Sequence, residues 1–184
     1  MADLKITELS ALTTVLGEDL LAIVDDPTGT ASTKKIRAGD FQSTWHVGAR
    51  VTNSTDTTIA DVTATELDWD TEDWDTDTIH DAGNPERLTC KTAGKYFYWC
   101  IINYDGDAQG DRQARLYLGG LATGTLTAAS KSWNLGATAT CYVVLAGTID
   151  LAVNEYISFV AVHLAGNNLD VNALYSECGM QRIG

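Results

Sequence analysis

The segment Arg87–Tyr104 limits the possible folds of this chain more than any other. It predicts a hairpin of a short strand, a turn at Thr92-Ala93-Gly94 and a long strand from Tyr96 that is rich in aromatic and β-branched residues. Side chains alternate along a strand, so one face carries Tyr96, Tyr98, Cys100 and Ile102 and the other carries Phe97, Trp99 and Ile101. A strand in a small antiparallel sandwich usually has one face in water, yet both faces here are apolar up to Asn103. One face therefore requires a core and the other a second cover, most simply another copy of the chain.

Composition and charge narrow the class of protein. The chain has 184 residues, enough for one medium domain or one domain with a small appendage. It has no apolar run of membrane-spanning length, and its first residues lack the layout of a signal peptide, so we expect synthesis and use without classical secretion. The net charge of −13 argues against a nucleic-acid partner. The four cysteines have no zinc-like spacing and are predicted to be buried thiols.

Residues 1–43 differ in character from the remainder and predict a small β-hairpin module. Leu20–Val24 indicates one strand, the segment from Asp25 to Thr30 a turn, and Thr33–Arg37 the return strand. A single hairpin is marginally stable by itself, so we expect this module to dock on another protein. Residues 44–48 are a candidate linker, and residues 49–184 a separate head.

The module resembles a short N-terminal module of tailed-bacteriophage fibre and virion-surface proteins. The matching motifs, in order, are Lys5-Ile6-Thr7-Glu8-Leu9, Asp19-Leu20-Leu21-Ala22-Ile23-Val24-Asp25-Asp26, Thr33-Lys34-Lys35-Ile36 and Phe41. The resemblance covers about the first quarter of the chain and implies attachment to the virion. The residues that would carry this attachment are Ile6, Leu9, Leu21, Ile23, Lys34 and Ile36. The alternative is a generic hairpin arm.

From residue 49 onward the sequence predicts an antiparallel β-sandwich or jelly roll, and so an all-β protein. Short apolar segments separated by turns indicate eight to ten strands, with no convincing helical period. The segment Leu126–Trp133 is polar and predicts an edge strand, and Ala173–Met180 predicts a final strand. His163 lies in an apolar segment and is interpreted as a packed or inter-subunit histidine rather than a catalytic base.

The head resembles the jelly-roll domain shared by tumour-necrosis-factor (TNF) ligands and complement globular heads. The resemblance rests on Leu88-x5-Gly94-x-Tyr96-x-Tyr98 and on Cys178-Gly179-Met180, with Leu88, Tyr98 and Met180 at positions where phenylalanine is usual. Such heads are characteristically trimers packed through apolar strands of the inner sheet, which implies a homotrimer here. The residues predicted for the trimer interface or core are Tyr96, Tyr98, Trp99, Tyr142, Val144, Phe159, His163 and Met180.

An acidic segment, residues 67–81, is the strongest local signal for a ligand. Asp73, Asp75 and Asp77 have the spacing of the first three ligands of a calcium loop, but Thr78 and Asn84 stand where that loop has Gly and Glu. The sequence leaves open a non-standard calcium site or a solvated acidic loop held to the sandwich by two tryptophans, Trp69 and Trp74. No other cofactor is expected. Trp69, Trp74 and Trp133 are also candidates for stacking on sugars.

The sequence favours a non-enzymatic structural protein over an enzyme, because no nucleophile elbow, Cys–His signature or phosphate-binding loop is present. The leading hypothesis is a homotrimeric virion-surface protein of a tailed phage, made in the bacterial cytoplasm. Its N-terminal module would bind other virion proteins, and its head would bind a host glycan or protein. The first alternative is a capsid decoration protein that stabilises the shell. The second is a polysaccharide hydrolase that uses paired carboxylates of the acidic segment.

Overall fold

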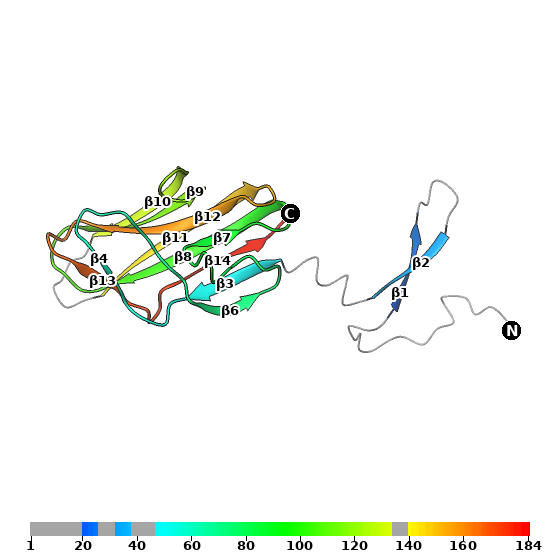
Figure 1. Ribbon diagram of the computed structural model, residues 1–184, viewed down its shortest axis with the longest axis horizontal. Helices are drawn as coiled ribbons and strands as arrows, with labels where there is room; N and C mark the ends of the chain where they lie inside the picture. The colour runs from blue at the N-terminus through cyan, green and yellow to red at the C-terminus, as the bar shows by residue number, and fades with distance from the viewer. Residues whose placement is uncertain (1–19, 26–31, 38–46, 134–139) are drawn as a thin grey trace. The chain divides into compact units, whose positions relative to one another are not determined.

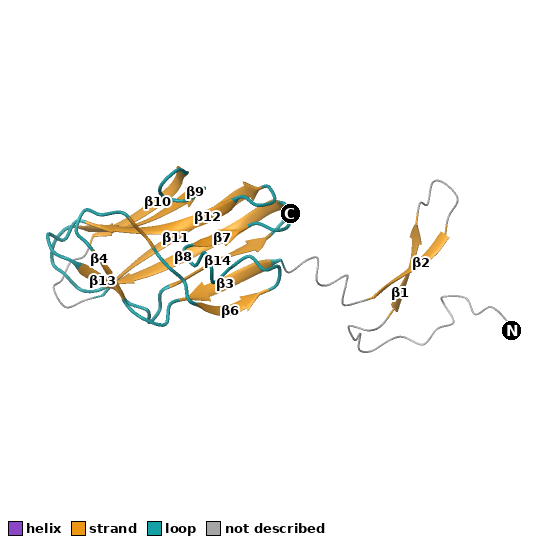
Figure 2. Cartoon of the chain, in the orientation of Figure 1, coloured by secondary structure: helices purple, strands orange, loops and turns teal. Residues whose placement is uncertain are grey.

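A computed structural model describes residues 20–25, 32–37, 47–133 and 140–184 of the chain. The chain divides into two units, Met1–Trp45 and His46–Gly184, with the division inside the predicted linker. In the described residues no helix is long and apolar enough to cross a membrane. Figures 1 and 2 show that strands and loops make up the described part of the chain.

The first unit contains an antiparallel hairpin of β1 (Leu20–Asp25) and β2 (Ser32–Arg37). Its register pairs Leu21 with Ile36 and Ile23 with Lys34. These are four of the six residues predicted to attach the chain to a virion. The other two, Ile6 and Leu9, lie outside the described residues, so the attachment role stays a prediction.

The second unit is an antiparallel β-sandwich, which confirms the predicted fold class. Its seven-stranded sheet contains β3 (Gly48–Thr52), β4 (Thr57–Ile59), β6 (Thr71–Asp75), β8 (Gly94–Tyr104), β11 (Cys141–Leu151), β13 (Leu169–Val171) and β14 (Glu177–Arg182). The strand β8 is central, with β14 on one side and β11 on the other, and β14 continues to β3 and β6. The short pair β13–β4 joins at the Tyr104 end of β8.

A five-stranded sheet forms the second layer. It contains β5 (Thr65–Glu66), β7 (Arg87–Thr89), β9 (Asp111–Leu118), β10 (Thr125–Trp133) and β12 (Tyr156–His163). The order is β10-β9-β12, and β5 and β7 both pair with the far side of β12. The strand β10 lies at the edge of this sheet, as its polar sequence predicts.

One face of β8 packs into the core between the two sheets, as the alternation of its side chains predicts. Tyr96, Cys100, Ile102 and Tyr104 are fully buried, and the ring of Tyr98 lies 6.4 Å from that of Phe159 on β12. Each such side chain removes apolar area from water at about 25 cal/mol per Å², so this face anchors the sandwich. All four cysteines are buried and free, which confirms the predicted thiols.

Two predicted features of the opening segment and the last strand are wrong. β7 and β8 do not form a hairpin: β7 pairs with β12, so residues 90–93 cross from one sheet to the other. Such a crossing lets the chain cover the core from both sides, which a hairpin in one sheet would not do. The last strand begins at Glu177 rather than Ala173, because Ser176 N donates to Ala173 O and closes a turn before it.

Candidate functional site

The outward face of the seven-stranded sheet is unusually apolar for a surface. On β8 the side chain of Phe97 is 40 % exposed, and Trp99 and Ile101 are half-buried. On β11, Tyr142 is 45 % and Val144 55 % exposed. In the register Val144 stands beside Ile101, so the apolar surface continues from the centre of the sheet onto β11. Contiguous apolar surface of this kind is typical of an interface.

Glycine positions allow an aromatic layer to lie flat on this face. A Cβ atom on Gly179 of β14 would lie 2.3 Å from Cζ2 of Trp99, which shows that the indole rests directly on the glycine backbone. The ring centroids of Phe97 and Trp74 lie 6.1 and 6.5 Å from that of Trp99. The layer therefore extends from β8 across β14 and β3 to β6 as one continuous surface.

A polar network fixes the edge of the aromatic layer. The indole Nε1 of Trp99 donates to Glu177 Oε1 over 3.2 Å, and Glu177 Oε2 accepts from Arg50. The guanidinium of Arg50 also pairs with Asp73. Because each charged group has an opposite partner, the network can support the indole without leaving an isolated charge beside the apolar surface.

The eight residues predicted for the trimer interface or core divide into two groups. Tyr96, Tyr98, Phe159, His163 and Met180 lie inside a single copy of the chain, buried between its own sheets. His163 is held there by a 3.0 Å hydrogen bond between Nε2 and Ile59 O. Trp99, Tyr142 and Val144 lie on the outward face instead. Only these last three are placed where another copy can contact them.

At one end of this face, a strained loop presents an exposed tyrosine. Tyr175 lies between β13 and β14 with φ of 70° and a side chain that is 64 % exposed. Its ring lies 6.5 Å from that of Tyr142, and its neighbour Leu174 is equally open to solvent. A positive φ is rare for a bulky residue, so the surrounding structure must impose it.

Three hydrogen bonds to two distant parts of the chain impose this conformation. Asn103 at the end of β8 donates from Nδ2 to Leu174 O over 2.9 Å, and its backbone N–H donates to Ser176 Oγ over 3.0 Å. The carboxylate of Asp56 accepts from Ala173 N over 2.8 Å. The loop is thus fixed on both sides of Tyr175.

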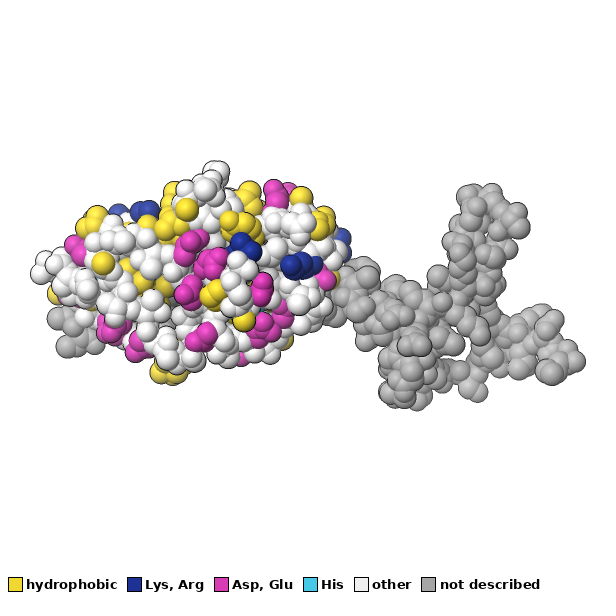
Figure 3. Space-filling view, in the orientation of Figure 1, with side chains coloured by type: hydrophobic (Ala, Val, Ile, Leu, Met, Phe, Trp, Pro, Cys, Tyr) yellow, Lys and Arg dark blue, Asp and Glu magenta, His cyan; other side chains and the backbone are white. Residues whose placement is uncertain are grey.

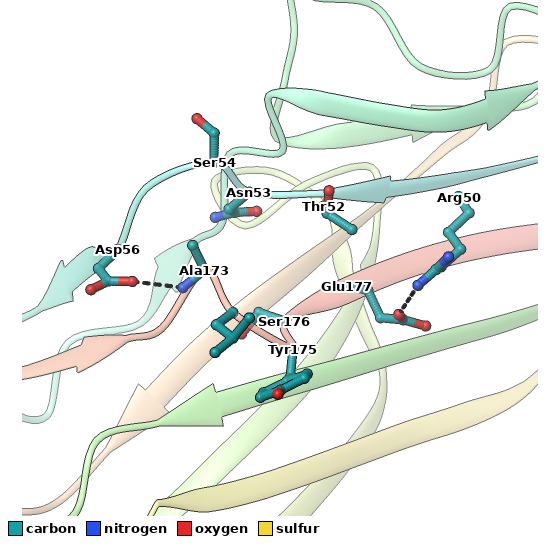
Figure 4. A pocket seen from close by; sticks show the side chains of 10 residues that line it. Arg50, Thr52, Asn53, Ser54, Asp56, Ala173, Tyr175, Ser176 and Glu177 are labelled. Carbon is teal, nitrogen blue, oxygen red and sulfur yellow. Dashed lines mark hydrogen bonds and ion pairs between the residues drawn. The ribbon is translucent and has the colours of Figure 1, made fainter.

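Beside this loop lies a groove of about 530 Å³, shown in Figure 4. One wall is the 173–177 segment, and the other is the segment 52–56 that follows β3. Arg50 and Glu177 form its remaining boundary, and the dashed lines in Figure 4 mark their contact and the Asp56–Ala173 bond. Sequence reasoning missed Tyr175 because residues 173–180 read as one continuous strand.

A carboxylate at the base of β6 holds the 52–56 wall. Asp70 Oδ2 accepts from Ser54 Oγ over 2.6 Å, and Oδ1 accepts from Ser54 N over 2.7 Å. The hydrogen bond from the Ser54 hydroxyl is the main reason that the pKa of Asp70 is lowered, and Thr71 and the Ser54 backbone add to it.

We expect Ser54→Ala to raise the pKa of Asp70 toward the ordinary value of about 3.9. Because the folded pKa is lowered, this contact stabilises the wall above that ordinary value and is lost as the pH falls through the folded pKa. Carboxyl-carbon NMR titration measures the shift. Asp81, whose lowered pKa depends on Gly83 N–H, serves as the internal control and should not move. An unchanged pKa of Asp70 in the variant would contradict the role given to the Ser54 hydroxyl.

The predicted calcium ligands Asp73 and Asp75 contact different partners in the structure. Asp73 pairs with Arg50, whereas Asp75 accepts from the backbone N–H groups of Asp77 and His80. The described part of the chain has no group of three or more His, Cys, Asp or Glu side chains placed to hold a metal ion. Asp73 lies at a register shift of β6, which turns it toward the β3 strand. The three carboxylates are not gathered at one point in this structure, and calcium binding by this segment stays a prediction.

The acidic segment is held to the sandwich, as the non-calcium interpretation expects. Trp69 is fully buried, and Trp74 packs toward Trp99. The buried ring of His80 contacts Glu72 through Nδ1 at 2.8 Å. Trp133 alone of the three predicted sugar-stacking tryptophans is widely exposed, with Lys131 over its ring.

Comparisons with known proteins agree with the fold. No protein-family model matches the sequence, and no curated protein matches it. Several solved structures are similar in fold. Murine APRIL has a TM-score of 0.58 and 12 % identity, covering 75 % of this chain and 99 % of its own. The Eiger TNF from S. frugiperda has a TM-score of 0.58 and 9 % identity, and the match covers 76 % of this chain and 93 % of that one. The globular domain of zebrafish complement 1qA has a TM-score of 0.53 and 13 % identity, and the match covers 75 % of this chain and 98 % of that one.

These similarities define the second unit as a TNF-like jelly roll of the kind seen in TNF ligands and complement heads. At identities of 9–14 % they establish the fold and nothing more specific. The resemblance predicted for residues 49–184 is thereby confirmed at the level of fold.

Proposed function

We propose that this protein is a homotrimer assembled through the outward face of its seven-stranded sheet. The observation that carries the proposal is the apolar outward surface to which Tyr142 and Val144 contribute exposed side chains and Trp99 a half-buried one. An apolar surface of this kind favours burial against a matching protein surface. Jelly rolls of the type that this chain resembles are characteristically trimers, which selects three copies over two.

We further propose that the trimer is a structural protein of a tailed-phage virion, attached through its N-terminal module. The support is the ordered set of motifs in residues 5–41 together with a hairpin at 20–37. The head would then bind the host surface. Three identical weak sites on one trimer provide avidity without a high affinity at any one of them.

Binding experiments with the purified full chain test this function. A host-binding head should bind intact host cells, whereas a capsid decoration protein should bind purified capsids and stabilise them against heat. A variant of the hairpin, Ile23→Asp with Ile36→Asp, should lose particle binding and retain the jelly roll. Binding to neither cells nor particles would contradict the proposed function.

A hydrolase is less well supported by the geometry. Asp73 is neutralised by Arg50, and both oxygens of Asp75 already accept backbone hydrogen bonds. Release of reducing sugar from a host polysaccharide, lost in Asp73→Asn with Asp75→Asn, would nevertheless reinstate it.

A further inference from the structure

We propose that the groove beside Tyr175 binds a neutral, hydroxyl-rich saccharide, with the tyrosine ring as the stacking surface. This inference deepens the proposed host-binding role and rests on it for its biological meaning. The binding itself requires only residues of one copy.

The first argument is the conformation of Tyr175. A positive φ carries a strain cost for non-glycine residues, which persist in it where the surroundings over-determine them. Here that cost positions a side chain that is mostly in solvent and adds little to the core. An aromatic ring carried on a fixed backbone at the rim of a groove is suited to stacking on the apolar face of a sugar ring, because the loop loses little conformational entropy on binding.

The second argument is the set of polar atoms around the groove. Asp56 uses only Oδ1, toward Ala173 N, and no described residue contacts its Oδ2. The hydroxyls of Thr52 and Tyr175 likewise have no partner among the described residues. A saccharide hydroxyl both donates and accepts, so it can pair with the carboxylate and with the hydroxyls together.

The third argument is charge. The residues that line the groove include two carboxylates, Asp56 and Glu177, and a single cation, Arg50, which is already paired with Glu177 and Asp73. The whole chain carries −13, and on the face shown in Figure 3 acidic side chains are widespread while Lys and Arg form small groups. A sialylated, uronic or phosphorylated ligand would meet repulsion, so the saccharide is neutral.

The fourth argument is position within the jelly roll. The groove lies at the Thr52 end of β3, whereas the chain enters this unit at the Gly48 end of the same strand. The C-terminus lies at that entry end too, since Lys95 N donates to Gly184 O at the start of β8. In Figure 1, β4 and β13 mark the groove's end of the unit and the C-terminal label marks the other. The saccharide would bind at the end remote from the chain's point of entry.

The test uses the full chain on a printed panel of neutral and acidic oligosaccharides, followed by titration calorimetry with the best-bound neutral one. Tyr175→Gly removes the ring and also relieves the positive φ, so the variant should fold at least as stably as the natural chain. We expect its affinity to fall about tenfold or more. Tyr175→Phe keeps the ring and should retain most of the binding. Trp133→Ala, at another exposed aromatic, should leave affinity unchanged.

The outcomes separate this inference from the proposed function. Absence of any neutral saccharide binding, a preference for acidic saccharides, or a loss in Trp133→Ala but not in Tyr175→Gly would each overturn the site. If the trimer nevertheless adheres to host cells, the proposed function stands without this site. If Tyr175-dependent binding is found in a protein that does not adhere to cells, the site stands and the adhesive role fails.

Discussion

Val144→Glu is expected to separate the proposed trimer into folded monomers. The side chain of Val144 projects from the outward face of β11 and is 55 % exposed in a single copy, so a glutamate there is accommodated in the monomer. In the trimer the carboxylate would be buried against apolar surface, and an uncompensated buried charge costs several kcal/mol. Repeated at three interfaces, this cost should shift the protein to monomer at micromolar concentration. Sedimentation velocity measures the result.

The matched control for this variant is Val153→Glu. Val153 has nearly the same exposure, 53 %, but follows β11 in a turn, away from the outward face. It should remain trimeric, with an unchanged circular dichroism spectrum. If both variants dissociate the trimer, or neither does, the interface does not include the outward face of β11.

Gly179→Ala is expected to lower stability and disturb the aromatic layer. Its Cβ atom would lie 2.3 Å from Cζ2 of Trp99 and 2.5 Å from the backbone oxygen of Ala49. The indole can move only by breaking its bond to Glu177, and the Ala49 oxygen belongs to the β3 ladder, so neither relaxation is easy. Overpacking of this kind costs roughly 1–3 kcal/mol. Denaturant unfolding and tryptophan fluorescence would measure the two effects.

A second substitution divides this cost between its two sources. In the background of Trp99→Ala, Gly179→Ala should be less damaging, because only the contact with Ala49 O remains. Gly83→Ala is the control: its nearest atom would be a flexible carboxylate oxygen of Asp81 at 3.3 Å, and little change is expected. Equal costs for Gly179→Ala in both backgrounds would show that Trp99 does not rest on this glycine.

The period-two pattern of β8 was sufficient to predict which residues face the core. Tyr96, Tyr98 and Cys100 are buried, while Phe97 and Trp99 face outward, because strand geometry fixes alternation regardless of the partners. The polar edge strand and the buried cysteines follow from similarly local rules. The TNF-like fold was predictable because motifs at both ends of the head supported it together.

Features that depend on distant partners were not predictable. Whether β7 pairs with β8 or with β12 is decided by how the core closes, not by the residues of the turn between them. The turn at Tyr175 depends on Asn103 and Asp56, which are 72 and 119 residues away from it in the chain. The segment 173–180 has no glycine or proline before Gly179 that would indicate a turn. The carboxylates of the acidic segment have the spacing of a calcium loop, but an arginine on β3 and backbone amides engage them.

The interface residues illustrate the same division. An apolar strand pattern shows that both faces need cover but not which neighbour supplies it. For Phe159 and His163 the cover is the chain's own seven-stranded sheet, whereas Val144 stays exposed and Trp99 is only half-buried on the outward face. Only the second pair bears on assembly.

Sedimentation equilibrium of the purified full chain at micromolar concentration tests most directly whether three copies assemble through the outward face of the seven-stranded sheet. A mass three times the 19.8 kDa of the chain is the expected result. A stable monomer at that concentration would leave the outward face of the seven-stranded sheet in water, and would contradict both the trimer and the multivalent adhesion built on it.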